Sequence, residues 1–539
     1  MKKWVTRGFA LALSLSLSMT AVLTGCGNSA NNGKEGSADA DSGNAAQNQS
    51  SVGETVNGNT TAQQGTATQL EFPDPSTLSG ELTVSCYETV MLKPFLEEAA
   101  SSFEAKYPGT KINVESFAVM PEVKTREEGN MKMMVMMQED DSQAKTDYIN
   151  KVNTELMSGR GADIYAFDIL PYHKYISGGQ LENLRPYIDN DPQFNIVDYR
   201  SNILDATASP NGQFIFPLDY SFNYLNYDST LFNESEQAVL DGKDQWSYKE
   251  LIAKGEEAFH RVNADGDISN PLFCMTTEGG WDQSMFGELF ESNLDTFLDI
   301  TGKKANFDDG KFVELLNTVK SYEELGYTDI PEDMGERIMS QNIMDAPVGK
   351  KYLYKPMASM NLLSEFNKGS GRRIARRVVI GMMSDTENDK ILGLPESENG
   401  EIRFSYSQAY GINANSENKF LAWAFIRHLC GDEAQLSMQL MGFPINREVL
   451  TRKAEMEFTG ALYDPENAGE ELDADRQAAL EKYLETVEKY SSMLNTHILE
   501  DSVVTDMVFT EVSSFFDGSK SAEDVAKTLQ SKISLYLNE

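Results

Sequence analysis

Cysteine is scarce in this chain, with four residues in 539. None of the four belongs to a C-x-x-C pair, which argues against a thioredoxin-like redox motif or a multi-cysteine metal site. Cys26 lies in the N-terminal segment, and the other three, Cys86, Cys274 and Cys430, are widely spaced. We interpret these three as small buried side chains. A Cys86–Cys430 disulfide is the alternative.

Histidine is equally scarce, and its four residues are scattered at His173, His260, His428 and His497. The sequence contains no H-E-x-x-H, no G-x-S-x-G and no phosphate-binding loop, so the motifs of the common hydrolase and nucleotide-binding classes are missing. We therefore expect a protein that is not an enzyme and has no cofactor and no metal. A glycosidase needs only two carboxylates across a cleft, so a lipid-anchored carbohydrate hydrolase remains an alternative.

Basic residues are outnumbered by acidic ones, 46 to 84, which gives a formal net charge of −38. This balance argues against a nucleic acid as partner and against a polybasic membrane-binding patch. It says little about a small ligand, because local groups in a cleft set the potential there.

The N-terminal segment has the pattern of a secretory signal. Lys2, Lys3 and Arg7 precede an apolar run over residues 8–23, which is too short to span a bilayer as a mature helix. The following Leu-Thr-Gly-Cys resembles the lipobox of a bacterial lipoprotein. That resemblance implies a signal peptide over residues 1–25 and a lipidated (diacylglycerol, palmitate) Cys26 that anchors the chain to the extracellular face of the cell membrane.

Residues 26–77 are predicted to form a disordered linker behind the lipidated Cys26. Gly, Ser, Asn, Ala, Gln and Thr dominate up to about residue 68, and such a composition cannot bury enough apolar surface to fold. The remaining residues exceed what one hydrophobic core usually serves, so we expect two lobes.

The folded part opens with the pattern of a β-α-β unit. Residues 81–87 and 111–117 read as strands, and residues 91–107 place apolar side chains on one helical face. In sheets of this kind ligands bind beyond the carboxyl ends of the strands, which is where Tyr87, Glu88 and Thr89 stand.

Four longer stretches resemble family 1 extracellular solute-binding proteins, such as the maltodextrin-binding and other sugar-binding lipoproteins of ABC transporters. The four are E-L-M-S-G-R-G-A-D-I-Y-A-F-D over 155–168 with its continuation to 188, N-G-Q-F-I-F-P-L-D-Y over 211–220 with its continuation to 232, Y-G-I-N-A-N-S-E-N-K-F-L-A-W over 410–423 with its continuation to 435, and the closing helix pair up to residue 537. Together the matches cover nearly all of residues 80–539.

The resemblance implies an α/β fold of two lobes, joined by hinge strands, with a ligand cleft between them. On the family pattern the first lobe takes residues 78–218 and 407–455, and the second takes residues 219–406 and 456–539. Such proteins close on their ligand by a hinge motion. They then deliver it to the transmembrane subunits of an ABC permease. We expect this chain to act as a monomer.

The resemblance also implies where a ligand is held. The matching positions are Tyr87, Glu88, Phe167, Asp168, Asp219, Tyr220, Ser221, Glu278 and Trp281. Aromatic rings pack on the C–H faces of sugars and carboxylates accept hydrogen bonds from vicinal hydroxyls, so this set favours a carbohydrate. Alternatives stay open: Phe167 as core, Glu278 as a solvated loop residue, Tyr220 as hinge lining, and a ligand module that reports to a sensor kinase.

Three segments suggest other chemistry. Residues 263–270 resemble a calcium loop without its twelfth-position acid, and we expect a plain connection between a helix and a strand. The methionine-rich run 131–141 suggests packing rather than a copper(I) site. The arginine-rich run 371–377 suggests a solvated loop, with contact to a permease or an anion as the alternative.

Overall fold

The computed structural model describes residues 70–119, 142–275, 284–329, 351–366, 388–462, 471–498 and 501–538, and the backbone of residues 122–128 and 131–137. Several sequence predictions lie outside these residues. They are the signal peptide, Cys26 and most of the linker, the site residues Glu278 and Trp281, and the arginine-rich run.

The first sheet contains five strands in the order β2-β1-β5-β17-β6. The predicted β-α-β unit is confirmed, because β1 (Gly80–Cys86) pairs in parallel with β2 (Thr110–Ser116) and α1 (Leu92–Lys106) lies between them in the chain. β5 (Ile164–Ala166) continues the parallel order on the other side of β1. The last two strands, β17 (Ala409–Ile412) and β6 (Phe216–Pro217), are added by antiparallel pairing.

Each face of the first sheet has its own apolar core. Ile164 and Ala166 point into a core shared with α1 and α14 (Lys419–Leu429), whereas Tyr165, between them, points into a second core with α2 (Ser142–Met157) and α3 (Tyr172–Ser177). The alternation follows from the two-residue period of a strand. A sheet covered on both faces is the expected result for parallel strands joined through helices.

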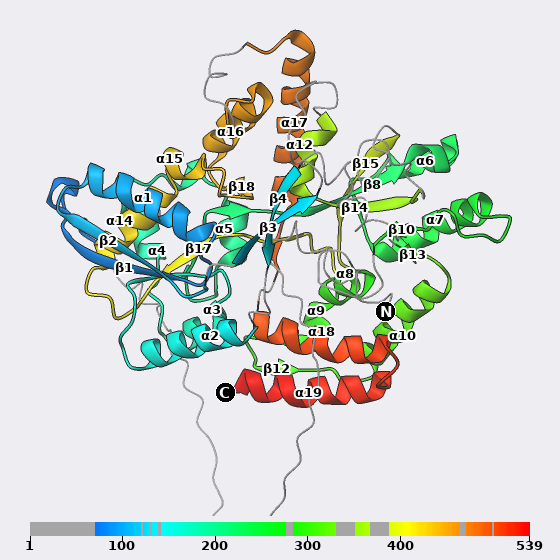
Figure 1. Cartoon of the computed structure of the whole chain (residues 1–539), viewed down its shortest axis with the longest axis horizontal. Coiled ribbons are helices and arrows are strands. Elements are labelled where there is room, and N and C mark those ends of the chain that lie inside the picture. Colours follow the sequence, from blue (N-terminus) through cyan, green and yellow to red (C-terminus); the bar gives the residue numbers. More distant parts are fainter. Residues whose placement is uncertain are drawn as a thin grey trace, which may run out of the picture.

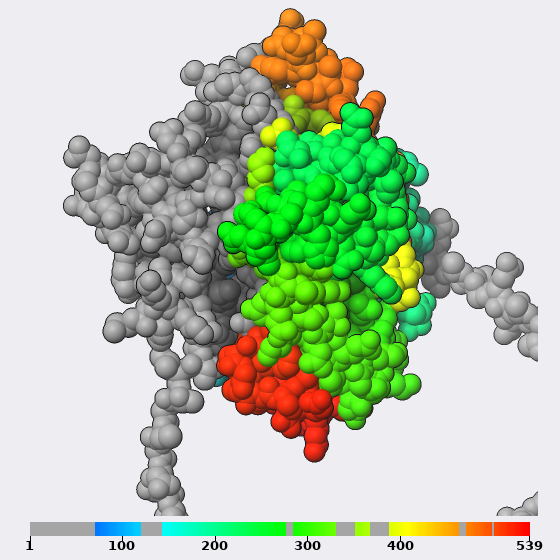
Figure 2. Space-filling view, turned by 90° about the vertical axis from the view of Figure 1, so that its right-hand side faces the viewer, coloured from blue at the N-terminus to red at the C-terminus, as the bar shows by residue number. Residues whose placement is uncertain are grey.

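The second sheet has six strands in the order β13-β10-β14-β8-β15-β9. Its strands are β8 (Asn223–Asp228), β9 (Gln245–Trp246), β10 (Phe273–Cys274), β13 (Thr328–Asp329), β14 (Tyr354–Ala358) and β15 (Asp389–Pro395). Its core also contains side chains of α7 (Tyr248–Val262), α8 (Met285–Glu291), α10 (Lys311–Glu324), α18 (Ser502–Phe516) and α19 (Ala522–Asn538). Figures 1 and 2 show the C-terminal pair α18–α19 along the lower edge of this half.

The chain passes between the two sheets three times. All strands of the first sheet come from residues 80–217 and 409–412, and all strands of the second come from residues 223–395. After β17 the chain forms α15 (Asp432–Gln435), α16 (Arg447–Thr459) and α17 (Ala474–Met493), and then crosses to α18. The lobe boundaries drawn from the sequence stay a prediction.

Short elements complete the described chain. The helices are α4 (Arg185–Asn190), α5 (Ser201–Thr207), α6 (Glu234–Leu240), α9 (Leu294–Phe297) and α12 (Leu362–Phe366), and the strand pairs are β7 (Asp219–Tyr220) with β18 (Phe443–Pro444), β16 (Arg403–Phe404) with β19 (Thr496–His497), and β11 (Leu298–Asp299) with β12 (Lys304–Ala305). A hairpin of β3 (Glu122–Glu128) and β4 (Met131–Met137), not foreseen from the sequence, carries the methionine-rich run.

The start of the described chain is fixed to the first sheet. Leu70 and Phe72 pack against the core on the α1–α14 side. The Phe72 ring meets Tyr187 edge-on at 6.2 Å and Phe420 at 5.3 Å between ring centroids. Edge-to-face contacts of this kind stabilise beyond the area they bury.

The side chain of Asp219, in the first crossing segment, is bonded to the second crossing segment and to the loop before β18. Its Oδ1 accepts hydrogen bonds from the backbone N–H of Ser407 at 2.8 Å and of Gln408 at 3.1 Å. Its Oδ2 accepts from the N–H of Gly442 at 2.9 Å and from the hydroxyl of Ser407. We call this arrangement the Asp219 clamp. Asp219 is fully buried, and burial raises the pKa of its carboxyl although the four donors lower it.

The close approach of Gly442 to the clamp leads to a stability prediction. A Cβ at residue 442 would lie 2.5 Å from Oδ2 of Asp219 and 2.8 Å from the carbonyl oxygen of Tyr220. Gly442→Ala should therefore lower the free energy of unfolding by about 1–3 kcal/mol, the usual cost of overpacking. Gly178→Ala is the control, because only the flexible side chain of Gln180 lies near its Cβ. Urea unfolding measures both, and equal midpoints would contradict the clamp.

Candidate functional site

Four of the predicted site residues meet at the carboxyl ends of β1 and β5. The Asp168 carboxylate, beyond the end of β5, accepts hydrogen bonds from the N–H of Tyr87 at 3.1 Å and of Glu88 at 2.8 Å, both beyond the end of β1. Burial raises the pKa of Asp168 to about 6; the nearby Glu88 carboxylate adds to the rise and the N–H donors oppose it. The structure thus brings these residues together at the place where such sheets bind ligands.

Glu88 occupies the N-terminal end of α1. Its carboxylate accepts hydrogen bonds from the N–H of Met91 at 2.8 Å and also from those of Val90 and Leu92. These N–H groups would otherwise offer a positive dipole end to an anion. Because an acidic side chain of the protein already accepts hydrogen bonds from them, these N–H groups are not free to bind an anionic ligand.

The aromatic side chains of this set are buried. Tyr87 is 4% exposed and Phe167 is 2% exposed, and both belong to the core between the first sheet and helices α2 and α3. The Phe167 ring lies 6.0 Å from that of Tyr172 and 6.4 Å from that of Tyr175. Phe167 is therefore a core residue in this conformation, the alternative stated for it, and its contact with a ligand stays a prediction.

The three predicted hinge residues lie on β7 and directly after it. Tyr220 is fully buried and its hydroxyl lies 2.7 Å from that of Ser491 on α17, while the Arg200 guanidinium lies 5.5 Å from its ring. Ser221 is half-buried and exchanges backbone hydrogen bonds with Ser405. With Asp219 taken up by its clamp, all three hold the crossing segments together, and a direct role in ligand binding stays a prediction.

A second set of side chains, not identified from the sequence, lies beside α3. The His497 ring stacks on that of Tyr406, with 4.6 Å between centroids and 4° between planes, and its Nδ1 lies 3.4 Å from the Tyr172 hydroxyl. Burial lowers the pKa of His497 to about 3. The neighbouring strands β16 and β19 have two residues each, which is too short for a strand pattern to be recognised in the sequence. The only sequence signal was the rarity of histidine.

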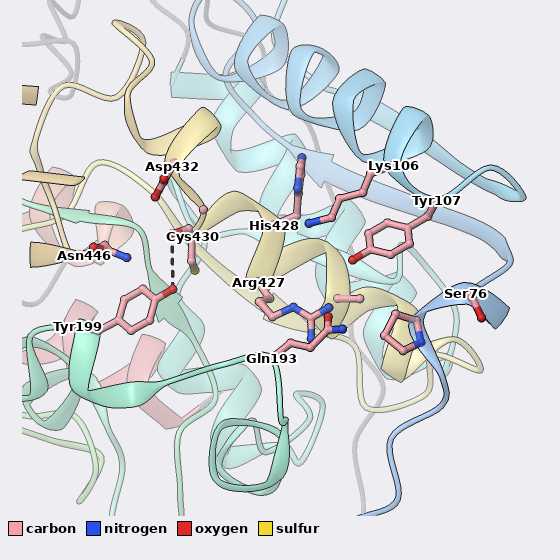
Figure 3. A pocket seen from close by; sticks show the side chains of 13 residues that line it. Ser76, Lys106, Tyr107, Gln193, Tyr199, Arg427, His428, Cys430, Asp432 and Asn446 are labelled. Carbon is pink, nitrogen blue, oxygen red and sulfur yellow. Dashed lines mark hydrogen bonds between the residues drawn. The ribbon is translucent and has the colours of Figure 1, made fainter. Parts of the chain in front are cut away.

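A pocket of about 690 Å³ opens on the first half, away from these residues (Figure 3). Side chains from the end of α1, from the end of α14 and from the loop before α5 line it, among them Lys106, Tyr199, Arg427, His428 and Asp432. Most of its charges have partners: Arg427 pairs with Asp191, Asp432 with Arg452 at 2.8 Å, and His428 bonds to Ser102 at 2.7 Å. This leaves Lys106 without an ion pair among the described residues, too little to define a ligand.

The thiols and the calcium-like loop have structural roles. Cys86 and Cys430 are free and buried, as predicted, Cys274 is free and half-buried, and the alternative Cys86–Cys430 disulfide is wrong. Residues 263–270 connect α7 to β10, as expected. The Asn263 side chain closes this loop by donating to the carbonyl oxygen of Asn270 at 2.9 Å and accepting from its N–H at 3.0 Å.

No group of three or more His, Cys, Asp or Glu side chains within the described residues is placed to hold a metal ion. Within the same residues, no helix has the length and apolar character needed to cross a bilayer.

Comparison with known proteins identifies the fold. No family model matches the sequence, and no curated protein matches it. An extracellular solute-binding protein family 1 member from Alicyclobacillus acidocaldarius is 17% identical with a TM-score of 0.51, over 86% of this chain and 99% of that chain. A putative oligosaccharide periplasmic-binding protein from Synechococcus sp. MITs9220 is 11% identical with a TM-score of 0.52, over 85% of this chain and 99% of that chain. The predicted two-lobed α/β fold of periplasmic binding proteins is confirmed.

The half-buried His497, whose Nε2 is shielded from water, leads to a prediction about pH. The unfolded chain binds a proton at this residue near pH 6.5, whereas the folded chain does so only near pH 3. Stability is therefore lost as the pH falls below about 6.5. Relative to His497→Gln, the wild type should lose about 2 kcal/mol of unfolding free energy between pH 7 and pH 5. The exposed His260 is the control, since His260→Gln should leave this pH dependence unchanged. Parallel curves of unfolding free energy against pH for wild type and His497→Gln would disprove the lowered pKa of His497.

Proposed function

We propose that this chain is an extracellular solute-binding protein that captures a carbohydrate, most simply an oligosaccharide, by hinge closure and delivers it to the transmembrane subunits of an ABC importer. The observation that carries the proposal is the Asp219 clamp. It joins two of the three chain crossings and the loop before β18 at one place, so the two sheets can turn about it while the ends of β1 and β5 form one wall of a cleft. Hinges of this kind are a few residues at the ends of elements.

The charges at the cleft wall support a neutral ligand. Asp168 and Glu88 place two carboxylates side by side, and their N–H partners come from the protein itself. A phosphate or carboxylate ligand would meet like charge there. The hydroxyls of a sugar can donate to the remaining lone pairs of the carboxylates. The name of the Synechococcus protein, with the same fold, points to the same ligand class.

We assign different roles to the predicted site residues. Glu88, Asp168 and Ser221 are half-buried, and we propose that they contact the ligand. Tyr87, Phe167, Asp219 and Tyr220 are buried, and we propose that they hold the wall and the hinge in place. Glu278 and Trp281 remain proposed ligand residues of the second lobe on the basis of the family resemblance.

Ligand binding is tested by thermal unfolding of the full-length chain against a panel of mono- and oligosaccharides, with phosphate, a peptide and a polyamine as controls. A neutral sugar at 100 times its dissociation constant should add about 2.7 kcal/mol of stability, and the controls should add none. Asp168→Asn should reduce the shift because it removes an acceptor of the wall. Asp267→Asn, in an exposed loop, should leave it unchanged.

The other outcomes of this panel are equally informative. No shift with any sugar would overturn the carbohydrate proposal, and a shift with the polyamine alone would replace the sugar with a cationic solute. A shift accompanied by sugar cleavage would favour the hydrolase. Binding without cleavage in a strain where loss of the chain leaves sugar uptake intact would favour a module that reports to a sensor kinase.

We further propose that the chain is held at the extracellular face of the membrane by a lipid on Cys26. The wild-type chain expressed in a bacterium should incorporate labelled palmitate and sediment with the membranes. Cys26→Ser should lose both properties, because the acylated thiol is removed. Cys274→Ser is the matched control and should keep both. Labelling of Cys26→Ser at the wild-type level would refute the anchor.

A further inference from the structure

Helix α3 of the first half touches the C-terminal helix of the second half through Lys174. The Lys174 ammonium donates a hydrogen bond to the carbonyl oxygen of Tyr536, near the end of α19, at 2.9 Å. It also lies over the Tyr536 ring, 3.4 Å from its centroid. A cation held by a backbone oxygen and an aromatic face at once is fixed in position rather than loosely paired.

A second contact stands beside the first, between His173 of α3 and Asp501 at the start of α18. Asp501 is 1% exposed, and its carboxylate is held by the N–H of Val503 at 3.1 Å, by that of Val504 at 3.2 Å and by the Tyr536 hydroxyl at 3.0 Å. His173 Nε2 lies 3.2 Å from Oδ2 of Asp501. Groups of α18 and α19 thus hold the Asp501 carboxylate in place independently of its contact with His173.

Apolar and polar packing continues this contact on both sides. Val503 of α18 packs against the core formed by α2, α3 and the first sheet. The hydroxyl of Ser502 reaches the carbonyl oxygen of Ile169 at 3.4 Å. On the other side the Tyr172 hydroxyl meets His497. The two halves therefore touch at α3 and at the start of α18, apart from the contacts of the Asp219 clamp.

We propose that His173, Lys174, Asp501 and Tyr536 form a latch that holds the two lobes closed in the absence of ligand. The inference rests on the proposed hinge closure and adds to it the resting state and the residues that set it. His173 and Lys174 are positioning residues, because they contact the opposite lobe and not the ligand. By holding the lobes closed they raise the affinity of the chain for its ligand. A ligand gains apparent affinity when its binding-competent form is already populated.

The latch is built to be reversible. Neither ring nitrogen of His173 has a hydrogen-bond partner of good geometry within the described chain, although both are buried. Opening of the lobes would expose them to water, which satisfies them and offsets part of the lost contacts. The lobes can therefore part to admit or release a ligand.

The test measures the distance between the lobes in the full-length chain without ligand. Spin labels at Met157→Cys, at the end of α2, and Leu325→Cys, after α10, are placed at exposed positions on the two halves. Cys26 and Cys274 are replaced with Ser so that they do not take up the label. Cys86 and Cys430 are kept, because both are buried and shielded from the label. Pulsed dipolar spectroscopy then gives the distance distribution.

We expect one narrow distance population for the wild type and a second, longer population in Lys174→Met that holds at least half of the molecules. His173→Gln should give the same direction of change, and circular dichroism verifies that both variants are folded. Lys527→Met, an exposed lysine on α19, is the matched control and should give the wild-type distribution.

Two results would overturn the latch: a wild-type distribution dominated by long distances, or distributions for both folded variants that match the wild type. Neither depends on any sugar. A failed latch with an intact thermal shift on sugar removes only this inference. A working latch in a chain that no sugar stabilises removes only the carbohydrate proposal.

Discussion

One buried carboxylate, that of Asp219, governs how the two sheets are joined. Charge in a protein interior is costly unless hydrogen bonds compensate it, and here four donors from the second crossing segment and from the loop before β18 do so. The buried Gln408 in turn would lose the partner of its N–H without Asp219. The mutual dependence makes the crossing a single unit, so the surrounding pairs β7–β18 and Ser221–Ser405 can be as short as they are.

Buried charge is compensated in the same way at the proposed ligand-binding wall. The carboxylates of Glu88 and Asp168 satisfy the backbone N–H groups at the start of α1 and at the end of β1. A site for an anion would leave such groups open to the ligand. Local hydrogen bonding therefore bears on the ligand class, whereas the net charge of −38 describes the whole chain and excludes only large polyanions as partners.

The β-α-β unit was predictable to within one residue at each end, because periodicity and the helix-stopping Pro108 and Gly109 are local signals. The hairpin β3–β4 was not predicted. Its methionine-rich run has no periodic pattern that indicates a strand, and it was interpreted as packing. The contacts of Asp219, Lys174 and His497 could not be predicted, because each joins residues roughly two hundred or more positions apart in the chain. Glu88 and Asp168 were found by position along the family pattern, but their hydrogen-bond partners were not.

The packing of Phe72 attaches the N-terminal segment to the half of the molecule that contains the first sheet. Its ring is held between Tyr187 and Phe420, both in the core of the first sheet. Any rotation about the crossing segments therefore leaves residues 70–72 and the first sheet in one frame of reference. Under the proposed hinge closure, the second sheet with α18 and α19 moves relative to the N-terminal segment, and the first sheet stays fixed to that segment.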